Sequence, residues 1–184
     1  MPPLLRLAAR IDRLTRAVGQ MAAWLALAMV LVGAYNAIAR YVGRHFELRL
    51  TSNALVEAQW YMFSLLFLFG APWALQNGDH VRVDVLYGRL GKRGRARINL
   101  AGSLLLLLPF CVFAITTIAP SAWASFELRE VSNDPGGLLR WPLKLAMPLA
   151  FGLLFAQGVS EAIKSFYTLR GVELPALANE EEQA

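Results

Sequence analysis

The chain has 184 residues, of which 57% are hydrophobic and 17% charged, and its formal net charge is +5 at pH 7. A soluble domain of this size is closer to half apolar and spaces those residues periodically, whereas here they form long unbroken runs. The composition excludes an ordinary soluble domain, and the basic residues are more typical of topology signals and lipid contacts than of a nucleic-acid partner.

Four apolar runs define the expected architecture, at residues 17–39, 54–75, 98–119 and 143–163. A helix rises about 1.5 Å per residue, so each run is long enough to cross a hydrocarbon core about 30 Å thick. Four such runs leave too little polar chain to cover them in water. We predict an all-α integral membrane protein with four transmembrane helices, built as a single domain over residues 1–184.

The segment before the first run is expected to lie on the membrane surface. Within residues 3–15, apolar side chains recur on one side of a helix and arginines lie largely on the other, which predicts an amphipathic interfacial helix. A cleaved signal peptide is the alternative. The apolar run that follows is about twice as long as the 7–15 residues of a signal core, which disfavours cleavage.

The second run begins and ends with polar residues that stand out. Asn53 is expected to cap this helix, and Glu57 to complement its positive end. Beyond its other end lies the stretch QNGDHVRVDV, in which Asp84 follows His80 by four residues. Two ligands are short of the three or four that zinc needs, so we predict no metal site. Apolar spacing predicts a second interfacial helix over residues 80–91.

The last two runs offer little reactive chemistry. Cys111 is the only cysteine, so no intramolecular disulfide can form. Near the end of the fourth run, Glu161 and Lys164 are spaced to form an ion pair on a helix. The chain has no GxSxG, HExxH or CxxC motif, no charge near the middle of a span and no paired halves with interrupted helices. We therefore expect neither an enzyme nor a self-sufficient transporter.

Lys and Arg residues concentrate on one side of the expected membrane, which the positive-inside rule assigns to the cytoplasm. That side receives the N-terminal segment, the connection between the second and third runs, and the tail. Both termini are thus expected to be cytoplasmic. The basic residues concerned are Arg6, Arg10, Arg13, Arg16, Arg82, Arg89, Lys92, Arg93, Arg95, Arg97, Lys164 and Arg170.

These residues together resemble the small membrane subunit of tripartite ATP-independent periplasmic (TRAP) transporters. The similarity rests on Glu57 and Trp60 in the second run, on GDHVRVD after it, on the loop SNDPGGL at residues 132–138, and on RWPLK at residues 140–144. It covers essentially the whole chain. The positions it marks as family pattern or subunit interface are Glu57, Trp60, His80, Asp84, Asp134, Pro135, Gly136 and Trp141.

The resemblance implies a non-catalytic scaffold subunit without a cofactor, in the bacterial inner membrane. Its partners would be a large membrane subunit that carries the sodium and substrate sites, a soluble periplasmic receptor that captures a solute, usually a carboxylate, and membrane lipid. Uptake would be driven by an ion gradient. The alternatives are an independent homo-oligomeric pore or carrier and, less favoured by the motifs, a membrane-embedded enzyme.

Overall fold

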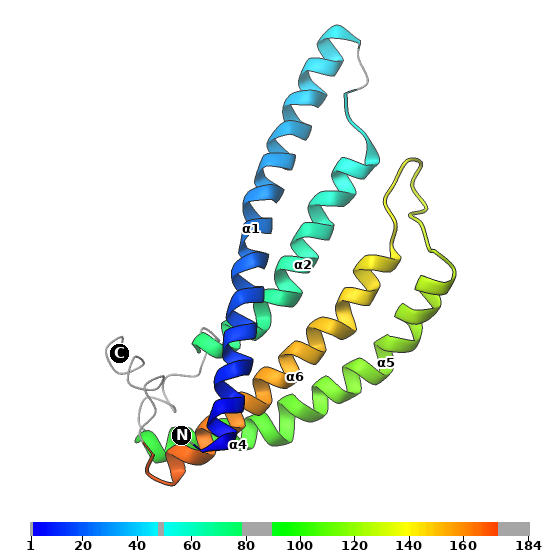
Figure 1. The fold of residues 1–184 in the computed structure, drawn as a ribbon. Coiled ribbons are helices and arrows are strands. Elements are labelled where there is room, and N and C mark those ends of the chain that lie inside the picture. Colours follow the sequence, from blue (N-terminus) through cyan, green and yellow to red (C-terminus); the bar gives the residue numbers. More distant parts are fainter. Residues whose placement is uncertain (1, 48–49, 79–89, 173–184) are drawn as a thin grey trace.

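The computed structural model describes residues 2–47, 50–78 and 90–172, and these residues form helices joined by short connections (Figure 1). The elements are α1 (Pro3–Phe46), α2 (Asn53–Asn77), α4 (Lys92–Gly102), a π-helix (Ser103–Leu107), α5 (Leu108–Glu127) and α6 (Trp141–Leu169). Helix α4, the π-helix and α5 follow one another without a break. Four helices are thus long and apolar enough to cross a membrane, and the described residues contain no β-strand. The predicted all-α class with four spans is confirmed.

The helices extend well beyond the apolar runs from which they were predicted. Helix α1 has 44 residues, which corresponds to about 66 Å, roughly twice the thickness of a hydrocarbon core. Residues 3–15, where an interfacial helix was expected, are helical and form the first turns of α1, which continues from them without a break. The second expected interfacial helix, at residues 80–91, falls almost entirely outside the described residues.

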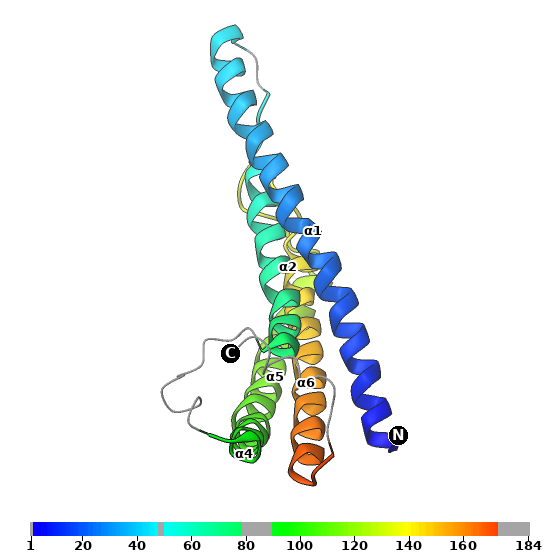
Figure 2. The same ribbon diagram turned by 90° about the vertical axis from the view of Figure 1, so that its left-hand side faces the viewer.

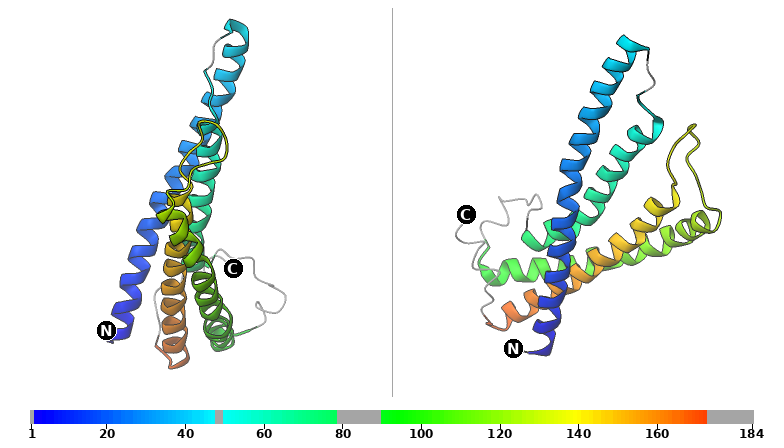
Figure 3. Two further views of the ribbon diagram at one scale, coloured as in Figure 1. Left: turned by 90° about the vertical axis from the view of Figure 1, so that its right-hand side faces the viewer. Right: turned by 45° about the horizontal axis from the view of Figure 1, so that its top comes forward.

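The helices form a thin, fan-like layer instead of a closed bundle. Neighbours pack in the order α1, α2, α6 and α5, and α1 also contacts α6. In Figure 1 the fan is seen from its broad face, with the N-terminus and the end of α6 at the bottom. Figure 2 and the left view of Figure 3 show it edge-on, where the helices overlap in a narrow band. Among residues 2–47, 50–78 and 90–172, no segment covers either broad face of this layer.

The core is correspondingly small, and large apolar side chains point outward. Helix α2 buries only two residues, Glu57 and Pro72. Trp24 on α1 and Leu105 in the π-helix are 71% and 73% exposed. Exposed side chains of this kind are stable only against lipid or another protein.

Helices α1 and α2 approach closely at Gly19. A Cβ atom at this position would lie 2.5 Å from the Cβ atom of Trp73 on α2, which is closer than real contacts allow. We expect Gly19→Ala to lower the free energy of unfolding in detergent micelles by about 1–3 kcal/mol, because the two helices must separate. Gly70→Ala is the matched control, since its Cβ would meet nothing within 4 Å. Equal stability of the two variants would contradict this packing.

Candidate functional site

The loop between α5 and α6, residues 128–140, is held against the first turns of α2. Asn53, Glu57 and Tyr61 are spaced four residues apart and therefore lie on one face of α2. The Asn53 amide donates a hydrogen bond to the carbonyl of Pro135 at 3.0 Å, and the Tyr61 hydroxyl donates to the carbonyl of Leu139 at 3.0 Å. One helix face therefore contacts the loop along much of its length.

Glu57 is the central contact of this face. The hydroxyl of Ser132 donates a hydrogen bond to one carboxylate oxygen of Glu57, and the Leu138 N–H donates to the other at 2.6 Å. The residue is only 3% exposed. Hydrogen bonds to a charged acceptor are stronger than neutral ones, and both oxygens are used. Glu57 is thus placed to hold the loop.

The loop itself is an ordered hairpin. The N–H of Ser132 donates to the carbonyl of Leu138, and the N–H of Arg140 donates to that of Glu130, both at 2.9 Å. Only glycine fits at position 137, because a Cβ there would lie 2.5 Å from the Ser132 Cβ and 2.8 Å from a Glu57 oxygen. The sequence motif SNDPGGL therefore forms a tight turn that packs against α2.

The base of the loop carries its own charge pair. Glu130 bonds the Lys144 ammonium of α6 and accepts a hydrogen bond from the Ser125 hydroxyl of α5 at 2.6 Å. The Lys144 and Ser125 hydrogen bonds hold the pKa of the Glu130 carboxyl below its usual value. Glu130 therefore stays ionised at neutral pH and ties the ends of the two helices to the loop between them.

The marked residues of the loop have distinct places. Asp134, Pro135 and Gly136 form the tip, where the Gly137 N–H donates to the Asp134 carbonyl at 3.0 Å and Gly136 has φ of +72°. Trp141 is the first residue of α6, and the centroid of its ring lies 5.2 Å from that of Phe126. The tip thus presents backbone and polar atoms, whereas Trp141 stabilises the base.

Of the other marked residues, the structure describes only Trp60. Trp60 is 42% exposed, and its ring lies edge-on against that of Tyr61 with 4.4 Å between the ring centroids. His80 and Asp84 lie outside the described residues. The capping role expected for Asn53 is wrong: Ser52 is the N-cap residue and makes no side-chain cap bond, while the Asn53 amide bonds the loop.

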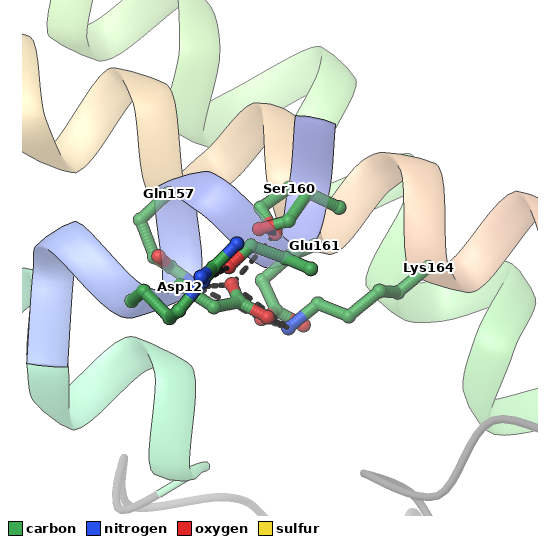
Figure 4. Close-up of polar contacts among 8 residues, drawn as sticks. Asp12, Gln157, Ser160, Glu161 and Lys164 are labelled. Carbon is green, nitrogen blue, oxygen red and sulfur yellow. Dashed lines mark hydrogen bonds and ion pairs between the residues drawn. The ribbon is translucent and has the colours of Figure 1, made fainter. Parts of the chain in front are cut away.

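A second polar cluster joins α1 to α6 near the N-terminus. Figure 4 shows Gln157, Ser160, Glu161 and Lys164 of α6 converging on Asp12 of α1. Ser160 donates to an Asp12 oxygen at 2.7 Å, and Gln157 donates to it at 3.0 Å. Both donors are fully buried. The cluster holds the start of α1 on α6.

Lys164 provides the positive charge of this cluster. Its ammonium pairs with Glu161, as the helix spacing predicted, and also with Asp12 at 3.3 Å. Helix spacing predicts the first pair but not the contact with Asp12, which is far away in the chain. The one sequence feature that could have indicated a role for Asp12 is its carboxylate, which stands among the arginines at the start of the chain.

Neither cluster is arranged for bond-making chemistry. The carboxylates of Glu57, Asp12 and Glu161 already bond neighbouring side chains or backbone. Within the ranges that the structure describes, no group of three or more His, Cys, Asp or Glu side chains is placed to bind a metal ion. Both clusters are suited to fixing helices and the loop in position.

A comparison with protein families identifies one relationship. The family described as "Tripartite ATP-independent periplasmic transporters, DctQ component" matches residues 29–168, which is most of the chain and includes both the loop and its anchor Glu57. No curated protein and no solved structure matches the chain.

Proposed function

The chain belongs to the DctQ component family of TRAP transporters, and we propose that it serves as the small scaffold subunit of a three-part solute importer. It would pair with the large membrane subunit, which carries the transport sites, and help to dock a periplasmic solute receptor. Uptake of a carboxylate-type solute would be driven by an ion gradient. The chain is a multi-pass membrane protein, and we place it in the bacterial inner membrane with both termini cytoplasmic.

One observation carries the proposal: the four spans form an open layer with a very small core. Large apolar side chains are exposed on α1 and along the helical run from α4 to α5, including Trp24, Leu105 and Leu106. A chain that performed transport alone would need to enclose a polar pathway. An open apolar layer is better suited to extend a partner's surface within the membrane, with lipid covering the rest.

The loop supports the proposed docking role. If both termini are cytoplasmic, residues 128–140 and the α1–α2 connection face the periplasm. The tip residues Asp134, Pro135 and Gly136 would then be available to a soluble receptor, on a loop that Glu57 holds rigid. We assign Trp60 and Trp141, together with His80 and Asp84, to family-pattern or subunit-interface positions.

Reconstitution tests this function directly. We expect the chain to copurify with a much larger polytopic subunit, and receptor-dependent solute uptake into proteoliposomes to require both membrane proteins. The control is the large subunit with receptor but without this chain. Unchanged uptake in that control would contradict the scaffold role. Solute flux through liposomes that contain only this chain would instead favour a homo-oligomeric pore or carrier.

A further inference from the structure

A small polar pocket lies between α1, the start of α2 and the tip of the 128–140 loop. Its volume is about 280 Å³, below the roughly 300–1,000 Å³ of sites for drug-sized ligands. The elements that form it meet at the end of the molecule opposite the N-terminus (Figure 1). Its size fits a small ion or a headgroup. The lining residues are Asn36, Arg40, Thr51, Ser52, Asn53, Val56 and Pro135.

Asn36 is the first sign that the pocket binds something. This residue is only 7% exposed, yet its Oδ1 atom is buried and has no hydrogen-bond partner. A buried amide without a partner is costly, and natural proteins rarely retain one without a ligand or water. The Nδ2 donor of the same side chain also makes no hydrogen bond to a described residue, and Asn36 lines the pocket. Asn36 can therefore donate to a ligand in the pocket.

The charges around the pocket favour an anion. Arg40 lies one helical turn after Asn36 and so on the same face of α1, and it forms no ion pair with any described residue. No Asp or Glu is among the lining residues. One full positive charge therefore faces the pocket, and no carboxylate of the described residues pairs with it.

The start of α2 adds to this charge. A helix N-terminus has unpaired N–H groups and a partial positive charge that attracts anions. Here the N-cap residue Ser52 makes no side-chain cap bond, and the first turn of α2 contains no acidic residue. The hydroxyls of Thr51 and Ser52 line the same space. These groups together supply donors for an oxyanion.

We propose that this pocket binds a monoanionic phosphodiester. One guanidinium and one partial helix charge balance a single negative charge, and the amide, hydroxyl and guanidinium donors match phosphate oxygens. The phosphodiester can belong to a phospholipid headgroup or to a small soluble molecule. Val56, which lines the pocket and is 44% exposed, can contact an acyl chain of such a lipid.

Titration of the purified full chain in maltoside micelles, which contain no phosphate, tests the proposal. Diethyl phosphate and dioleoylphosphatidylglycerol are the two probes, and the phosphorus resonance of each reports binding. We expect Arg40→Gln to weaken binding about tenfold or more, because a charge-assisted hydrogen bond is lost. Arg44→Gln, an exposed arginine one turn further along α1 that does not line the pocket, should bind like the unchanged chain.

A second variant makes the test independent of Arg40. Asn36→Asp places a carboxylate in the pocket and should abolish binding by repulsion, while circular dichroism checks that the helices persist. Binding of diethyl phosphate that depends on Arg40 supports a site for soluble phosphodiesters. Arg40-dependent binding of the lipid alone supports a headgroup site. If neither probe binds, or if Arg40→Gln and Arg44→Gln behave alike with both probes, the proposal is wrong.

Discussion

Replacing Lys164 with methionine is expected to lower the free energy of unfolding by about 3 kcal/mol. The change leaves the carboxylates of Asp12 and Glu161 together without their cation, and removing one partner of a buried ion pair costs about 3–5 kcal/mol. We expect the low end of that range because the side chains are 12%, 20% and 21% exposed for Lys164, Asp12 and Glu161. Unfolding in mixed micelles, followed by tryptophan fluorescence, measures the effect.

Two further variants show whether charge or packing is responsible. Lys164→Arg keeps the cation that the two carboxylates need and should therefore lose clearly less stability than Lys164→Met. Asp12→Asn combined with Lys164→Met removes one carboxylate with the cation, so the double variant should regain part of the stability lost by Lys164→Met alone. If Lys164→Met and Lys164→Arg were equally stable, the ion cluster would not be what holds α1 on α6.

Replacing Glu57 with leucine is expected to release the 128–140 loop from α2. The Ser132 hydroxyl and the Leu138 N–H both lose their acceptor, and a loop with fewer hydrogen bonds opens more often. Hydrogen exchange of peptides that cover residues 131–139 should therefore accelerate at least about tenfold. If the loop is the docking surface, receptor-dependent uptake by the assembled transporter should also decrease in this variant.

The comparison variants separate the loop contact from a general effect of charge. Glu57→Gln keeps one acceptor oxygen and should give intermediate exchange, because an amide oxygen can replace only one of the two carboxylate oxygens. Glu47→Gln removes a carboxylate from an exposed position at the end of α1 and should leave the loop unchanged. Exchange in Glu57→Leu as slow as in Glu47→Gln would show that Glu57 does not hold the loop.

Hydropathy alone locates the membrane spans but not the ends of the helices. The runs at 17–39 and 98–119 identified the first and third spans, but the helices extend over Pro3–Phe46 and Lys92–Glu127. Apolar length reports where a helix can lie in lipid. It does not report where backbone hydrogen bonding stops, which depends on caps and on polar residues that are also good helix formers.

The candidate site shows the corresponding limit for function. Glu57 stands out in the sequence because a carboxylate near a membrane span is costly without a partner. Its partners Ser132 and Leu138 follow it by 75 and 81 positions, and no local sequence pattern predicts these contacts. The same is true of Asp12, which is separated from Lys164 by 152 positions.

The sequence by itself determined the all-α membrane class, the number of spans and the Glu161–Lys164 pair, and its motifs indicated the family. These features follow from local rules: a backbone in lipid must satisfy its hydrogen bonds within a helix, and residues three or four apart share a helix face. Only the tertiary structure decided that the helices form an open layer, that α2 holds the loop through Glu57, and that Asn36 and Arg40 line one pocket with the start of α2. Such contacts join residues distant in the chain, and they depend on how whole helices pack.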